Sequence, residues 1–163
     1  EMSSILDVQT GLYNKRGFAK RMEEELDVAR REGVDYTVLI VDLNELKTIN
    51  DKEGHAIGDE YIESAADMLR KTSRKSDIVA RTGGDEFTVL LRTNRFGAMH
   101  WGQRMVRNFS NTSVSLAIGS APLDINNPQT SVKLADSRMY KAKEQSHKLG
   151  INYYFDGTAA NAA

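Results

Sequence analysis

The feature of this sequence that most restricts its fold is an apolar stretch from Tyr36 to Asp42. Its residues are mostly β-branched or aliphatic, a pattern typical of a strand buried on both faces. Such a strand needs packed layers on each side, and helices are the elements that can supply them here.

Helical and strand patterns alternate around this strand. From Asn14 to about Glu32, apolar residues fall at helical spacing, with Asn14 as the expected N-cap and Gly33 as the expected stop. Further helices are expected over Glu45 to Asp51, from after Gly58 to about Lys71, from Gly97 to Phe109, and from Thr130 to Ser146. Further strands are expected over Asp77 to Thr82, Phe87 to Leu91, Ser113 to Ile118, and Ile151 to Phe155. This order predicts an α/β (α+β) domain, with a central mixed sheet of about five strands flanked by helices.

The length of 163 residues predicts one domain, residues 1–163, with a frayed tail over 157–163. The formal net charge is −1, from 22 basic and 23 acidic side chains. Proteins that grip a nucleic-acid backbone carry a basic excess, so no polymeric nucleic-acid partner is expected. The absence of cysteine excludes disulfides and thiolate metal sites.

The longest wholly aliphatic run is Val38 to Val41, which is far too short to cross a bilayer. We therefore expect no membrane contact by this domain and a cytoplasmic location. A membrane anchor or sensor in a longer parent protein stays open.

Acidic residues lie where strands are expected to end or turn. Asp42 closes the buried strand, and Asp85 and Glu86 follow Gly83 and Gly84 between two short strands. The two glycines favour a tight hairpin, because glycine accepts positive φ at little cost. Carboxylates that converge from a strand end and a hairpin can hold Mg²⁺, which prefers hard oxygen ligands. The alternative is that these acids only cap turns, and spacing alone does not decide between the two.

Five segments resemble the motifs of the GGDEF domain family, in the family's order. The run RTGGDEF at Arg81 to Phe87 is similar to the family signature. The other segments are DVQTGLYNKRGF at Asp7 to Phe18, VDLNELKTINDKEGHAIGD at Val41 to Asp59, VSLAIGSA at Val114 to Ala121, and LADSRMYKAK at Leu134 to Lys143. The resemblance implies a fold similar to nucleotide cyclase and polymerase palm domains, with diguanylate cyclase activity.

The resemblance also implies a metal site, with Mg²⁺ or Mn²⁺ as the cofactor. Its protein ligands would be Asp42, the backbone carbonyl of Leu43, and Asp85. The position of Asp85 is also the one assigned as proton acceptor in the family. Glu86 would lie beside the metals and the reacting groups.

For the nucleotide, the resemblance assigns guanine recognition to Asn50 and Asp59, with His55 lining the site. An asparagine can donate to and accept from a guanine edge, while an aspartate can accept from its N1–H and N2–H groups. Adenine lacks that donor pair, so Asp59 favours GTP over ATP. Lys47 and Lys143 match lysines that contact phosphates, although without the resemblance each is better interpreted as a surface lysine.

The reaction that the resemblance implies needs two subunits. Each subunit of a homodimer would hold one GTP, and each 3′-hydroxyl would attack the α-phosphorus of the opposite nucleotide to give cyclic di-GMP. One subunit cannot complete the product, so dimerisation is an expected control point.

Arg74 and Asp77 lie in RKSD, just before the strand that leads into the signature. This placement is similar to the RxxD inhibitory site at which family members bind their product, cyclic di-GMP. Arginine offers a fork for phosphate or a guanine edge, and aspartate can accept from guanine N–H groups. The alternative is an ordinary surface charge pair.

Several positions depart from the family pattern. Asn44 replaces a frequent aspartate, and Gln9 stands where leucine is usual, which predicts a local packing change. Ser146, His147 and Lys148 occupy the expected places of glycine, arginine and asparagine, so a phosphate-contacting arginine is expected to be lost.

Two other functions compete with the cyclase hypothesis. One is a catalytically weak or inactive domain that senses cyclic di-GMP or GTP, which a degenerate signature would favour and the intact GGDEF does not. The other is a cyclase with relaxed base choice and a mixed GMP–AMP product, against which Asp59 argues. The input signal is not readable from the sequence.

Overall fold

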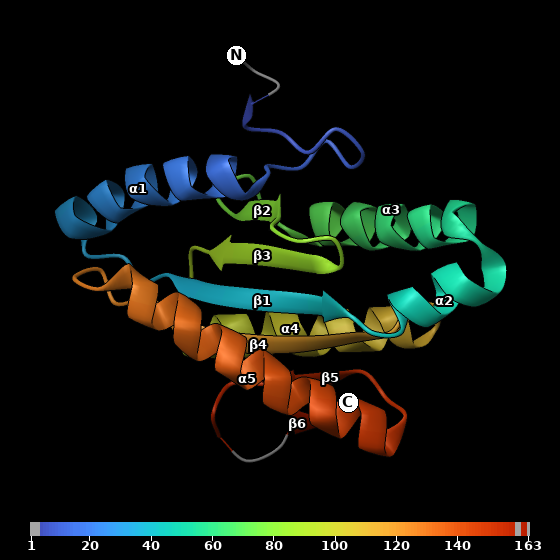
Figure 1. Ribbon diagram of the computed structural model, residues 1–163. Coiled ribbons are helices and arrows are strands. Elements are labelled where there is room, and N and C mark those ends of the chain that lie inside the picture. Colours follow the sequence, from blue (N-terminus) through green and yellow to red (C-terminus); the bar gives the residue numbers. More distant parts are fainter. Residues whose placement is uncertain (1–3, 159–160, 163) are drawn as a thin grey trace.

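The structure is a computed structural model that describes residues 4–158 and 161–162. Its elements are α1 (Lys15–Glu32), β1 (Thr37–Leu43), α2 (Leu46–Glu53), α3 (His55–Thr72), β2 (Ile78–Arg81), β3 (Glu86–Leu91), α4 (Arg95–Ser110), β4 (Leu116–Pro122), α5 (Pro128–Leu149), β5 (Tyr153–Phe155) and β6 (Asn161–Ala162). The strands form one sheet in the order β2-β3-β1-β4-β5-β6 (Figure 1).

The sheet is mixed, as predicted. β1 lies at its centre and runs antiparallel to both β3 and β4, and β2 runs antiparallel to β3. β4 and β5 are parallel, which is the pairing that makes the sheet mixed. The predicted fold class of a mixed sheet with flanking helices is confirmed.

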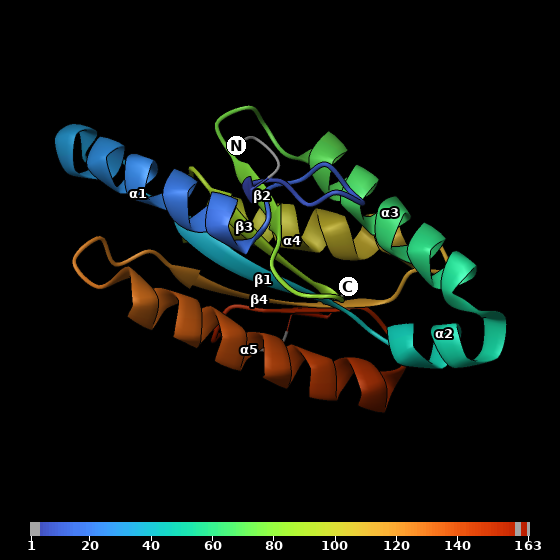
Figure 2. The same ribbon diagram turned by 45° about the horizontal axis from the view of Figure 1, so that its top comes forward.

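Helices cover both faces of the sheet. Val38 and Ile40 pack in a core with residues of α1 and α5, whereas Leu39 and Val41 pack in the core formed with α3 and α4. Figure 2 shows the sheet between α5 on one side and α3 and α4 on the other. All seven residues of β1 are buried, so the prediction of a strand covered on both faces is confirmed.

The ends of α1 match the sequence signals. The Asn14 side chain accepts a hydrogen bond from Gly17 N, and Gly33 ends the helix in the left-handed region at φ 65°. Several other boundaries differ from the predictions by a few residues. α3 begins at His55 instead of after Gly58, and α5 continues to Leu149, past Ser146.

The prediction for β4 was wrong in position. The strand covers Leu116–Pro122 instead of Ser113 to Ile118. Gly119 lies inside it, and a Cβ at that position would come within 2.1 Å of Met139 N and 2.4 Å of Ala135 O in α5. The glycine therefore permits close packing of α5 on the strand, where the sequence suggested a strand end.

The reason given for the hairpin between β2 and β3 also needs correction. Gly83 and Gly84 are absent from the glycines with positive φ in the described chain. The turn is closed instead by Thr82 N and Gly83 N, which both donate to Glu86 O at 3.0 and 3.2 Å.

The tail expected to fray lies partly outside the described residues. Asn161 pairs with Tyr154 and Ala162 with Tyr153, so β6 extends the sheet at the edge offered by β5. Among the residues that the structure describes, no helix is both long and apolar enough to span a membrane.

Candidate active site

The carboxylates predicted to converge do meet in the fold. Asp42 in β1 is paired directly opposite Glu86 in β3, and Leu43 N donates to Asp85 O at 2.8 Å. Residues directly opposite each other on antiparallel strands share a face of the sheet. Asp42 and Glu86 therefore lie on the α1 and α5 face, and the adjoining hairpin turn carries Asp85 beside them.

The carboxyl of Asp42 is buried beside other negative charges. Burial raises the pKa of its carboxyl, and the charges of Asp85 and Glu86 raise it further, while Lys143 opposes the shift. Asp42 is only 5% exposed, and its Oδ2 lies 3.0 Å from Lys143 Nζ. The fold thus holds several negative charges close together and partly neutralises them with one lysine.

The donor set of this group suits a hard cation. Asp42 Oδ2 is buried and accepts no well-aligned hydrogen bond from a described residue. No three His, Cys, Asp or Glu side chains in the described ranges form a complete metal cluster by themselves. Mg²⁺ is commonly bound through one or two carboxylates with phosphate oxygens and waters completing its shell. Asp42, Asp85 and the Leu43 carbonyl could provide the protein share of such a site.

Glu86 is held by hydroxyl groups of the same hairpin. Thr82 Oγ1 donates to Glu86 Oε2 at 2.6 Å and lies 2.7 Å from Thr88 Oγ1. An added Cβ at Gly84 would meet no heavy atom within 4 Å. The turn therefore leaves the backbone at Gly84 open to a ligand, while the Thr82 hydroxyl orients the Glu86 side chain.

The residues predicted to bind guanine lie at the corner between α2 and α3. Asn50 is half-buried in α2, and its Oδ1 lies 1.7 Å from where a Cβ on Gly58 would be. A side chain at position 58 would therefore displace the Asn50 amide from its place. Lys47, His55 and Asp59 are exposed around this corner, which follows the end of β1 (Figure 1).

Arg81 is a site residue that the sequence reasoning missed. Its guanidinium donates to Gly84 O at 2.8 Å, to Gln9 Oε1 at 2.8 Å and to Asp7 Oδ2 at 3.3 Å. These bonds tie the N-terminal segment to the turn before Asp85. Burial raises the pKa of Asp7, but hydrogen bonds from Thr10 and the charge of Arg81 outweigh it, so the pKa is lowered. The arginine that opens RTGGDEF was the available signal.

Gln9 was predicted to mark a packing change. It makes polar contacts instead, accepting from Arg81 and donating from Nε2 to Glu63 Oε2 at 3.4 Å. The substitution of a usual leucine thus links the N-terminal segment to α3 as well as to the hairpin.

Two departures from the family pattern contact each other. Asn44 Nδ2 donates to Ser146 Oγ at 2.8 Å and to Ser115 Oγ at 3.0 Å. Ser146 lies within α5, which ends at Gly150 in the left-handed conformation. A Gly-x-Asn sequence also occurs at Gly150 to Asn152, directly after this helix, and the loss of a phosphate-contacting arginine stays a prediction.

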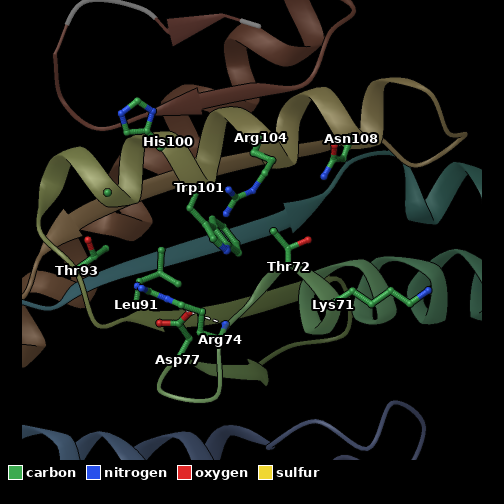
Figure 3. A pocket seen from close by; sticks show the side chains of 11 residues that line it. Lys71, Thr72, Arg74, Asp77, Leu91, Thr93, His100, Trp101, Arg104 and Asn108 are labelled. Atoms are coloured by element: carbon green, nitrogen blue, oxygen red, sulfur yellow. Dashed lines mark hydrogen bonds and ion pairs between the residues drawn. The ribbon is translucent and has the colours of Figure 1, made fainter.

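Arg74 and Asp77 line a separate cavity of about 670 Å³ between the α3–β2 loop and α4. Figure 3 shows Arg104 reaching from α4 toward the loop that carries Arg74. Lys71 and His100 also line this cavity, and the sequence reasoning missed these three residues. The positive charges of Lys71 and Arg104, with Arg74, suit an anionic ligand.

Asp77, which the sequence predicted as a ligand contact, is bonded to the backbone around its own loop. Its side chain is 2% exposed, and its oxygens accept from Arg74 N at 2.8 Å and from Arg92 N at 3.1 Å. In the described structure it fixes the loop, which leaves the exposed Arg74 as the more accessible member of the pair.

Comparisons with known proteins agree with the geometry. The family model described as "Diguanylate cyclase, GGDEF domain" matches residues 4–148. A curated relative, the probable diguanylate cyclase DgcC of Escherichia coli strain K12, is 37% identical over 158 residues, which is 88% of this chain and 42% of that protein. The chain thus spans less than half the length of this relative.

Solved structures give the same result. The isolated GGDEF domain of TpbB (YfiN) from Pseudomonas aeruginosa superposes with a TM-score of 0.84 at 31% identity, covering 94% of each chain. A microbial GGDEF domain studied for its interaction with cyclic di-GMP superposes with a TM-score of 0.83 at 25% identity, covering 94% of this chain and 97% of that one.

Proposed function

This chain belongs to the GGDEF domain family, and from that membership we propose that it is a diguanylate cyclase domain, which condenses two GTP into cyclic di-GMP. The observation that carries the proposal is the pairing of Asp42 with Glu86, which brings the strand-end aspartate and the signature hairpin together. The intact GGDEF run favours catalysis over a sensor role.

Asp42, Asp85 and the Leu43 carbonyl would hold Mg²⁺ or Mn²⁺. When bound, such an ion neutralises triphosphate charge and lowers the pKa of an attacking hydroxyl. Lys143 would contact the phosphates from α5, and Lys47 would do so from α2. Asn50 and Asp59 would select guanine, with His55 beside them.

The chemistry is two identical displacements. In each, a 3′-oxygen forms a bond to the α-phosphorus of the opposite GTP, the bond from that phosphorus to the bridging oxygen breaks, and pyrophosphate leaves. Asp85 would accept the proton of the 3′-hydroxyl, and Glu86 would lie beside the reacting groups. The protein contributes mainly positioning and charge compensation, and a homodimer is needed because each subunit supplies one nucleotide.

Separation of the nucleotides after incubation with GTP and Mg²⁺ tests this function. We expect cyclic di-GMP and pyrophosphate from the unmodified chain at high protein concentration. Asp85→Ala should lower the rate by at least about 100-fold, whereas Asp35→Ala, an exposed carboxylate in the loop before β1, should not. Addition of ATP should give no mixed product. A folded protein that leaves GTP unconverted under these conditions would refute the proposal.

A second function, binding of cyclic di-GMP as an inhibitor, is favoured by the cationic cavity beside Arg74. Arg74→Ala and Arg104→Ala should each weaken cyclic di-GMP binding about tenfold in calorimetry, because each removes a charged donor to phosphate. Arg107→Ala is the matched control, since Arg107 is exposed on the same helix and does not line the cavity. Unchanged affinity in both cavity variants would rule out this site.

A further inference from the structure

Lys143 contacts the carboxylate that is expected to receive a metal. Its Nζ lies 3.0 Å from Asp42 Oδ2, with the lysine side chain 33% exposed and the aspartate side chain 8% exposed. The contact joins α5 to the end of β1. One end of the ion pair is therefore fixed in the sheet, whereas the other is a flexible side chain at the surface of the site.

This contact is electrostatic more than directional. Asp42 Oδ2 accepts no well-aligned hydrogen bond within the described residues, although the ammonium is nearby. A lysine is a compact charge on a four-carbon stem and can point to a new partner without backbone movement. The pair is thus suited to exchange.

Lysine and metal compete for this oxygen. Mg²⁺ binds carboxylate oxygens at about 2.1 Å, so an ion on Asp42 Oδ2 would lie next to the ammonium. Two cations at such separation in a partly buried site repel strongly. Metal binding therefore favours departure of the lysine, and a triphosphate offers it a new negative partner.

We propose that Lys143 is an exchangeable counterion, which neutralises Asp42 in the nucleotide-free domain and transfers to the triphosphate when metal and GTP bind. The inference rests on the proposed function, because it takes the metal and nucleotide from it. Its consequence is that metal alone binds weakly and that metal and nucleotide strengthen each other's binding, by the same factor in both directions.

The test is a Mn²⁺ titration followed by electron paramagnetic resonance, first without nucleotide. Lys143→Met should bind Mn²⁺ about tenfold more tightly than the unmodified domain, because no ammonium has to be displaced. Lys143→Gln should show the same gain, which keeps the test valid if one variant folds poorly. With GTP and Ca²⁺ in place of a catalytic metal, both variants should bind the nucleotide more weakly.

Lys141→Met is the matched control. Lys141 lies two residues earlier on α5 and its Nζ is 6.0 Å from the centre of the Phe155 ring, so its loss removes the same charge away from Asp42. Its Mn²⁺ affinity should stay unchanged, and Asp42→Asn should abolish the tight Mn²⁺ binding gained by Lys143→Met.

Equal or weaker Mn²⁺ binding by both Lys143 variants would overturn the exchange, as would a gain that persists when Asp42→Asn is added. These outcomes are separable from failure of the cyclase proposal. If the unmodified domain forms cyclic di-GMP but the Lys143 variants gain no Mn²⁺ affinity, only the exchange fails. If the gain appears without any product, the cyclase proposal fails and the counterion role stands.

Discussion

At the scale of single residues, Asp42 combines burial with nearby like charge. Burial and the charges on Asp85 and Glu86 raise the pKa of its carboxyl in the folded domain. The folded state therefore binds this proton more readily than the unfolded chain does. The stability contributed by the group is present at low pH and is lost as the pH rises through the folded pKa.

Asp42→Asn should accordingly stabilise the metal-free domain near neutral pH, by on the order of 1 kcal/mol. The difference from the unmodified chain should shrink as the pH falls, because Asp42 itself then becomes neutral. Urea unfolding in a chelator at several pH values measures this. Asp35→Asn, at an exposed position, should change the free energy of unfolding only slightly. A less stable Asp42→Asn domain at neutral pH would contradict the inference that the charged Asp42 carboxylate destabilises the metal-free fold.

At this scale, the sequence predicted site residues that are recognisable within their own segment, and it missed contacts between residues far apart in the chain. Asp42, Asp85 and Glu86 were predicted because each is recognisable in its own strand end or turn. The hydrogen bond between Asn44 and Ser146 spans 102 positions, and the sequence around either residue does not predict its partner. The same holds for Arg81, whose partners Asp7 and Gln9 lie far away in the sequence.

At the scale of elements, the position of α5 on β4 depends on Gly119. Periodicity predicted both elements, because the helical and strand patterns are local. Periodicity misplaced β4, because it cannot show why a glycine lies inside the strand. Gly119 is required by the backbone of Met139 and Ala135, in a helix that follows later in the chain. The hairpin was predicted for a similar reason, although its glycines lack the positive φ on which the prediction rested.

Gly119→Ala should destabilise the domain by about 1–3 kcal/mol, since the added methyl would meet backbone atoms that cannot rotate away. The nearest of these atoms, Met139 N, would lie 2.1 Å from the added Cβ. Gly84→Ala is the matched control, because an added Cβ there meets nothing within 4 Å, and its effect should stay within about 0.5 kcal/mol. Urea unfolding of the two variants makes the comparison. A change of similar size at both positions would show that packing against α5 is not the cause.

At the scale of the whole molecule, the fold places the carboxylate group and the cationic cavity in separate regions of one domain. The carboxylates share the α1 and α5 face, while the cavity lies between the α3–β2 loop and α4. A ligand in the cavity would therefore leave the carboxylate group uncovered. The proposed control at Arg74 would have to act on how two subunits approach each other, which the sequence of one chain does not describe.

The central claim, that two copies of the Asp42 and Asp85 site together convert GTP to cyclic di-GMP, is tested most directly by the initial rate as a function of protein concentration. For an untethered chain that is mostly monomeric, the rate should rise with the square of the concentration, because two subunits must meet. A version fused to a dimeric coiled coil should be active in direct proportion to its concentration. Failure of the fused dimer to form product from GTP and Mg²⁺ at any concentration would contradict the account.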